Sequence, residues 1–206
     1  MGASVRRAAQ SGSSGWAGCG VVAAIGLPAF LVLGVAANGH GGIAFLMLLA
    51  FTGVGVAIGR DQARRTSEFK RVRAMQSMEI ARYHAMDPRE FEHAIAYLCR
   101  RDGCHQVQVV GGAGDLGADV VAVSPDGRRI VIQCKRYGPT TKVGSPDLQR
   151  FGGTCYSVHG AQVAAIVTTS VFTRPAADYG VRLGIRLFDL GALAGWATRT
   201  GPAPWM

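Results

Sequence analysis

The stretch that decides the fold begins with the glycine-rich loop Gly111-Gly112-Ala113-Gly114-Asp115-Leu116-Gly117 and continues as Ala118-Asp119-Val120-Val121-Ala122-Val123. A turn, Ser124-Pro125-Asp126-Gly127, separates it from Arg129-Ile130-Val131-Ile132-Gln133-Cys134-Lys135-Arg136-Tyr137. Both apolar runs are short and rich in β-branched residues, and the residues between them favour a turn. The pattern therefore predicts an antiparallel β-hairpin.

The two faces of the predicted hairpin differ in their side chains. Side chains alternate between the two faces of a strand. The first strand therefore carries Asp119, Val121 and Val123 on one face, and the second carries Val131, Gln133 and Lys135. The alternate set on the second strand is wholly apolar and predicts the core face: Ile130, Ile132 and Cys134. A carboxylate, an amide and a lysine are thus expected together near one end of the hairpin, as a functional site.

The spacing of Asp119 and Gln133-x-Lys135 resembles the PD-(D/E)xK nuclease motif in its Mrr-type restriction endonuclease form, in which glutamine stands in place of the second acid. The resemblance covers about residues 87–195. It also includes Phe91-Glu92, Gly114-Asp115-x-Gly117, Arg136-Tyr137, Val167-Thr168-Thr169 and Phe172-Thr173. It implies an α/β, restriction-endonuclease-like fold with a mixed central sheet flanked by helices. It also implies metal-dependent hydrolysis of DNA.

The resemblance assigns a role to each candidate residue. It makes Glu92 and Asp119 ligands of Mg²⁺ or Mn²⁺, with the backbone carbonyl of Cys134 as a third ligand, and carboxylate oxygens suit such hard cations. It places Lys135 beside the attacking water and the scissile phosphate. It leaves Gln133 to coordinate the metal or to position water, because an amide cannot act as a base.

Two alternatives for the acidic residues remain open from the residues alone. Glu90 lies close to Glu92, but the family's helix glutamate directly follows an aromatic residue, which favours Glu92 after Phe91. Asp115 is the rival of Asp119, although it lies in the loop and not on the strand face of Lys135.

The flanking sequence predicts helices around the sheet. Asp87-Pro88-Arg89-Glu90 has the spacing of a capping box with proline at the first helical position. From there the patterns predict the order helix, three strands, helix, strand, helix, strand, helix. The glycine loop also matches a dinucleotide-binding fingerprint, but a strand follows it where that mechanism requires a helix.

The N-terminal part predicts a membrane anchor. Residues 1–18 favour a disordered leader, and the segments 19–37 and 43–59 are almost wholly apolar. At ~1.5 Å per residue each would reach roughly 25 to 28 Å, about the thickness of a bilayer core. With the short connection 38–42, they predict a transmembrane helical hairpin. An alternative makes the first segment a cleaved signal peptide, since Val35-Ala36-Ala37 suits cleavage.

Charge indicates the orientation of that anchor. The chain has 22 basic and 13 acidic residues, and six of the basic ones lie between Arg60 and Arg73. Positive residues beside a span stay on the cytoplasmic side. We therefore expect residues 60–86 to form a basic cytoplasmic stalk helix and residues 87–206 to form the nuclease domain. The five cysteines have no zinc-ligand spacing and suit a reducing compartment.

These expectations combine into a multi-pass protein of the inner cell membrane that cleaves DNA in the cytoplasm. A nuclease held there would meet entering DNA, which suits a role in restriction of foreign DNA. Cutting both strands would call for a homodimer. The alternatives are a membrane-anchored DNA-binding or sensor module that keeps the fold without cleaving, and a protein whose basic stalk binds anionic lipid.

Overall fold

The computed structural model describes residues 41–112 and 114–206, and its first element is the 45-residue helix α2 (Gly41–Ala85). The second apolar segment and the stalk are therefore one continuous helix. Among the described residues, α2 is the one helix whose length and composition would allow it to cross a membrane. The leader and the first predicted span, residues 1–18 and 19–37, lie outside the described residues, so the transmembrane hairpin stays a prediction.

The chain divides into two compact units, Met1–Ser67 and Glu68–Met206. The second unit holds the end of α2 and nine further elements. In chain order these are α3 (Pro88–Arg101), β1 (His105–Val109), β2 (Val120–Val123), β3 (Arg129–Lys135), α4 (Ser145–Thr154), β4 (Val163–Thr168), α5 (Arg174–Arg182), β5 (Arg186–Phe188) and α6 (Leu190–Ala197). The order is the one that the sequence predicts.

The strands form one mixed sheet in the order β1-β2-β3-β4-β5. β1, β2 and β3 are antiparallel neighbours, and β2 and β3 form the predicted hairpin. β4 and β5 join in parallel, each after a helical crossover through α4 or α5. The prediction of a mixed sheet flanked by helices is confirmed.

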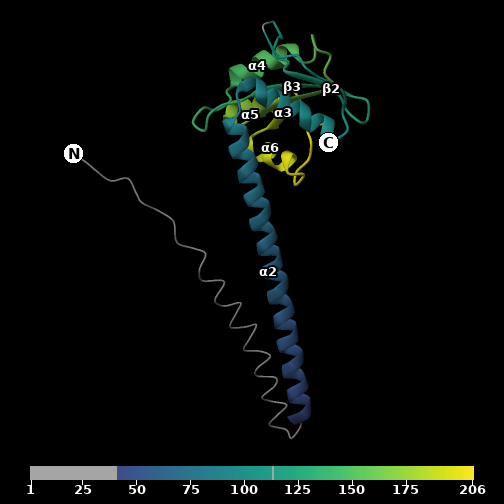
Figure 1. The fold of residues 1–206 in the computed structure, drawn as a ribbon, viewed down its shortest axis with the longest axis vertical. Helices are drawn as coiled ribbons and strands as arrows, with labels where there is room; N and C mark the ends of the chain where they lie inside the picture. The colour runs from purple at the N-terminus through teal and green to yellow at the C-terminus, as the bar shows by residue number, and fades with distance from the viewer. Residues whose placement is uncertain (1–40, 113) are drawn as a thin grey trace, which may run out of the picture. The chain divides into compact units, whose positions relative to one another are not determined.

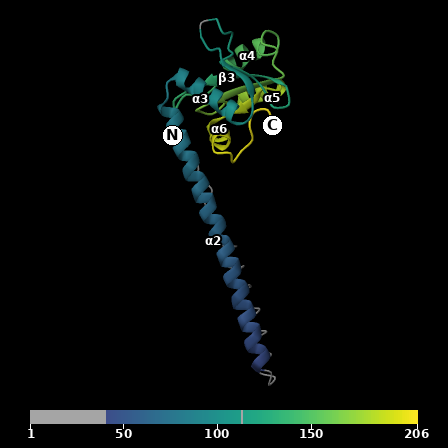
Figure 2. The same ribbon diagram turned by 45° about the vertical axis from the view of Figure 1, so that its right-hand side comes forward.

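Helices cover both faces of the sheet (Figures 1 and 2). On one face, α3 and α6 pack on strand residues such as Ile130 and Ile132. On the other, α4 and α5 pack on residues such as Val131 and Ile166. The prediction that the face of Ile130, Ile132 and Cys134 is the core face of β3 is therefore incomplete, because Val131 on the opposite face is also fully buried. Crossover helices on both faces are what buries the second face.

The start of α3 is fixed as its sequence predicts. The Asp87 carboxylate accepts a hydrogen bond from the Glu90 backbone N–H, and the Glu90 carboxylate accepts one from the Asp87 backbone N–H. This capping box uses the carboxylate of Glu90. Tyr83, near the end of α2, is almost fully buried and packs edge-on against Phe91 with ring centroids 5.8 Å apart.

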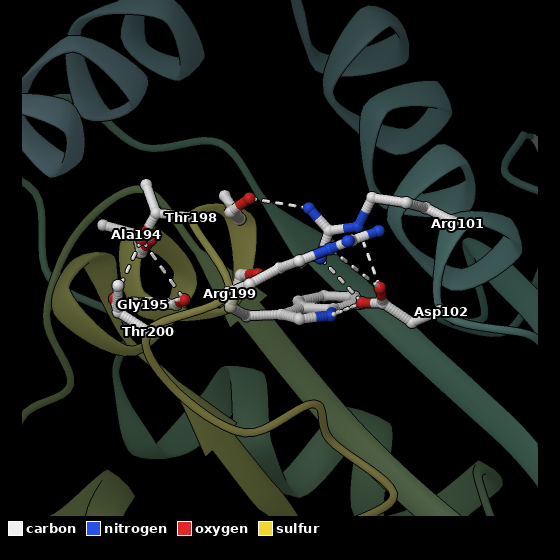
Figure 3. A network of polar contacts seen from close by, with 9 residues as sticks. Arg101, Asp102, Ala194, Gly195, Thr198, Arg199 and Thr200 are labelled. Atoms are coloured by element: carbon white, nitrogen blue, oxygen red, sulfur yellow. Dashed lines mark hydrogen bonds and ion pairs between the residues drawn. The ribbon is translucent and has the colours of Figure 1, made fainter.

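A polar network joins the end of α3 to α6 (Figure 3). Arg101 donates to the backbone carbonyls of Trp196 at 2.9 Å and Ala197 at 2.6 Å, and its guanidinium pairs with Asp102 at 2.7 Å. The Trp196 indole N–H donates to the same carboxylate at 2.8 Å. The hydrogen bond from Arg101 and that from Trp196 hold the pKa of Asp102 below its usual value, although partial burial opposes them.

Candidate active site

The hairpin brings Asp119 and Gln133 together at the end where β2 begins and β3 ends. Val121 pairs with Val131, and the Asp119 backbone N–H donates to the Ile132 carbonyl at 3.0 Å. Because side chains alternate along each strand, Asp119 and Gln133 lie on the face of that central pair. Asp119 is 8% exposed and Gln133 is 6% exposed, so both residues are buried.

Asp119 is a buried carboxylate in an acidic neighbourhood. Its pKa is raised from the usual value of 3.8 to about 6, chiefly by burial and also by the negative charges of Glu92 and Asp115. A hydrogen bond of 2.6 Å from the Cys134 backbone N–H to Oδ2, and the charge of Lys135, lower the pKa and oppose this shift. A site of this kind favours a bound cation, which would offset the burial of negative charge.

Glu92 extends from α3 into the space beside Gly111. A Cβ at Gly111 would lie 2.5 Å from Glu92 Oε2, so the carboxylate occupies the space that a side chain would fill. Burial, followed by the charge of Asp115, raises the pKa of Glu92. Glu90, the alternative from sequence, is occupied in the capping box. Glu92 is therefore the α3 carboxylate that lies with Asp119.

Asp115 shapes the glycine loop. Its two carboxylate oxygens accept hydrogen bonds from the backbone N–H groups of Gly112 at 2.9 Å and Gly117 at 2.8 Å. Gly117 has a positive φ of 87°, and a Cβ there would lie 3.1 Å from Gln133 Nε2. Only glycine meets both conditions without strain. Asp115 thus folds the loop over Gln133, and its charge acts on the site from the loop.

A cleft of about 380 Å³ opens between this loop and α4. Its lining comprises Asp115, Leu116, Gly117, Gln133, Lys135, Asp147, Arg150 and Thr154. The Thr154 hydroxyl donates to the Leu116 carbonyl at 2.7 Å and so ties the loop to α4. The structure therefore brings Gln133 and Lys135 into one cleft, whereas Asp119 is buried at the end of the hairpin and does not line the cleft.

Lys135 has a partner that the sequence reasoning missed. Its Nζ lies 3.8 Å from Asp147 Oδ1, and the two side chains are 22% and 14% exposed. The Tyr137 hydroxyl donates to Asp147 over 3.4 Å. The sequence analysis assigned Asp147 no role in the site. Its position in the first turn of the helix that follows the Gln-x-Lys strand is the signal that could have identified it.

The residues present fit a divalent cation. Glu92 and Asp119 supply carboxylate oxygens, and Gln133 Oε1 is buried without a hydrogen-bond partner, so it is an unused acceptor. Burial raises the pKa of the Cys134 thiol well above its usual value, so the sulfur is protonated in the metal-free protein. No cluster of three or more His, Cys, Asp or Glu side chains suited to a metal occurs within residues 41–112 and 114–206. A cation there would also need the Gln133 amide, a backbone carbonyl or water.

Comparison with known proteins gives one match to a family. Residues 83–197 match the model of the family Mrr_cat, described as restriction endonuclease, and this stretch is more than half of the 206-residue chain. It holds every predicted site residue. No protein of curated function matches the chain.

Solved structures show weaker similarity. The DNA modification-dependent restriction endonuclease AspBHI is 19% identical, with a TM-score of 0.47 over 65% of this chain and 37% of its own. The MspJI restriction endonuclease, solved with a 27-mer oligonucleotide, is 19% identical, with a TM-score of 0.43 over 61% of this chain and 31% of its own. A protein of unknown function, AF1548, is 24% identical, with a TM-score of 0.44 over 50% of this chain and 58% of its own. The chain thus spans less than two thirds of the length of each.

Proposed function

Because the chain belongs to the Mrr_cat restriction endonuclease family, we propose that it is a membrane-anchored, metal-dependent DNA endonuclease. The observation that carries this proposal is the meeting of Asp119, Gln133 and Lys135 at one end of the β2–β3 hairpin, with the Glu92 carboxylate set against Gly111. The alternative is an ordinary surface ion pair between Asp119 and Lys135. Such a pair would require neither the buried Oε1 of Gln133 nor the space that Gly111 leaves for the Glu92 carboxylate.

Each side chain has a distinct task in this proposal. Glu92 and Asp119 would hold Mg²⁺ or Mn²⁺, with the Cys134 carbonyl and Gln133 Oε1 as further oxygen donors. The cation would neutralise the phosphate and lower the pKa of its bound water. Lys135, at the floor of the cleft, stabilises the negative charge that develops on the phosphate oxygens and orients the attacking water. Gln133 positions that water but takes no proton from it.

Cleavage of supercoiled plasmid by the full-length protein in detergent tests the activity. We expect the wild type to nick the plasmid in Mg²⁺ and not in EDTA, and Lys135→Ala to lose at least a hundredfold in rate. Lys142→Ala is the matched control, because Lys142 is exposed and does not line the cleft. Salt-sensitive DNA binding without cleavage by the wild type would point instead to a non-cleaving DNA-binding module. A conversion of plasmid directly to linear form would support the proposed homodimer.

The exposed apolar surface of α2 supports the proposal of a membrane anchor. Large apolar side chains from Ile43 to Ile58 are 38% to 65% exposed, and Thr52 satisfies its hydroxyl within the helix through the Leu48 and Leu49 carbonyls. Such a surface suits lipid and not water. The basic residues that follow the apolar part of α2 would hold the nuclease unit in the cytoplasm, with segment 19–37 as the other arm of the hairpin. This location suits a role against incoming foreign DNA.

Two measurements test the anchor. The protein should resist extraction by alkali and require detergent for release. A reporter that is active only outside the cytoplasm, fused after Met206, should stay inactive. Release by alkali alone, or an active reporter, would contradict the anchored orientation.

A further inference from the structure

One wall of the cleft is a single face of α4. Asp147, Arg150 and Thr154 are spaced by three and four residues, so they lie along one side of the helix and all line the cleft. Arg150 is more exposed than Asp147 and Lys135, the two charged side chains beside it in the cleft. It is 77% exposed, whereas Asp147 is 14% and Lys135 is 22% exposed.

Arg150 has no structural task that would explain its position. Its guanidinium lies 3.6 Å from Asp147 Oδ1, which is an ion pair without a hydrogen bond. Asp147 already has other partners: the Gly144 backbone N–H donates to it at 3.3 Å, the Tyr137 hydroxyl donates to it, and Lys135 pairs with it. By contrast, the guanidinium of Arg136 donates to the Met86 carbonyl at 2.7 Å and so links two segments of the fold.

The site is rich in carboxylates, so DNA binding there requires positively charged side chains at its rim. The carboxylates of Glu92, Asp115, Asp119 and Asp147 lie in or beside the cleft, and Lys135 and Arg150 are the cationic side chains that line it. Lys135 is half-buried at the floor and would contact the scissile phosphate. A polyanion that reaches that floor passes Arg150 on the wall of α4. An arginine fork binds two phosphate oxygens at once, a geometry that a lysine does not provide.

We infer that Arg150 forms a second phosphate-binding subsite, which contacts the DNA backbone next to the phosphate that is cleaved. The inference rests on the proposed function of the cleft. Arg150 is a binding residue in this account, and its Asp147 contact keeps the guanidinium over the cleft until DNA replaces it. The subsite reads the phosphate backbone and carries no base preference.

The salt dependence of DNA binding isolates this contact. Each phosphate contact contributes about 0.9 to the slope of log affinity against log salt concentration. We expect Arg150→Ala to reduce the slope by about 0.9, measured by fluorescence anisotropy with full-length protein in detergent, a labelled duplex and EDTA. Over a fourfold range of salt, the variant should then lose about 3.5-fold less affinity than the wild type loses.

Two further variants make the result specific. Arg182→Ala, on α5, removes an exposed helical arginine that does not line the cleft, and it should keep the wild-type slope. Arg150→Lys keeps the charge without the fork, so it should recover most of the slope but not all of the affinity. In plasmid cleavage, Arg150→Ala should raise KM by more than it lowers kcat.

An unchanged slope in Arg150→Ala, or a change equal to that of Arg182→Ala, would overturn the inference. So would a loss confined to kcat, because that result would make Arg150 part of the chemical step. The binding measurement needs no cleavage. A wild type that binds with an Arg150-dependent slope but never cuts would therefore contradict the proposed nuclease activity and leave the phosphate subsite standing.

Discussion

Replacing Asp119 by asparagine should abolish cleavage and yet stabilise the metal-free protein. The carboxylate is almost fully buried, and its pKa is raised from 3.8 to about 6, chiefly by burial. The folded state therefore binds a proton more tightly than the unfolded state does. Asparagine keeps an oxygen that accepts from the Cys134 N–H, but it carries no charge to bury.

The size of the effect follows from the pKa. A tenfold change in proton affinity is worth ~1.36 kcal/mol, so the shift of Asp119 corresponds to about 3 kcal/mol. Because the folded pKa is the higher one, the contribution of Asp119 to the stability of the wild type is fully present below about pH 4. The wild type loses that stability as the pH rises to about 6 and changes little from this group above it. The asparagine variant lacks this loss. Its advantage should grow from near zero at pH 4 to about 3 kcal/mol at pH 7.

Urea unfolding in EDTA, followed by the fluorescence of the buried Trp196 and Trp205, measures both proteins. The informative quantity is the difference between the two free energies of unfolding at each pH, since other titrating groups cancel in it. A difference that does not change between pH 4 and pH 7, or a variant that is less stable at pH 7, would refute the reasoning that Asp119 is a strained, buried anion.

Two further substitutions test the packing of the site and of the fold. Gly111→Ala would place a methyl group 2.5 Å from Glu92 Oε2, so it should displace the carboxylate and raise the Mg²⁺ concentration for half-maximal cleavage about tenfold or more. Gly138→Ala is the control, because a methyl group there would meet no atom within 4 Å, and it should leave that concentration unchanged. The same Mg²⁺ titration for Gly111→Ala and the wild type would show that Glu92 is not part of the site. Asp102→Ala leaves the guanidinium of Arg101 unpaired at 15% exposure, so it should lower the free energy of unfolding by about 3 kcal/mol in urea titrations followed by circular dichroism. A loss below about 1 kcal/mol, which is typical of exposed ion pairs, would contradict that account.

The sequence predicted the helices and strands of residues 87–206 well because each carries a local signal. The Asp87 capping box marks the start of α3, the Pro/Asp/Gly turn marks the β2–β3 hairpin, and the continuous apolar run of β4 marks a strand buried on both faces. Motif spacing then placed Asp119, Gln133 and Lys135 at one end of the hairpin, which the register of β2 and β3 brings about.

Features that depend on contacts between distant segments were not predictable in the same way. The pairing of Lys135 with Asp147 joins a strand to the helix after it, and no local pattern requires it. The burial of Val131 depends on α4 covering the second face of the sheet. The position of Glu92 also depends on such a contact, because its carboxylate lies where a side chain at Gly111 would be.

The central claim is that Glu92 and Asp119 hold a divalent cation beside Lys135. Titration of the full-length protein with Mn²⁺, with the free ion measured by electron paramagnetic resonance, tests it without any substrate. The account predicts one bound ion in the wild type and in Lys135→Ala, with affinity at least tenfold weaker in Glu92→Gln and in Asp119→Ala. Equal Mn²⁺ binding by the wild type and both carboxylate variants would contradict the account.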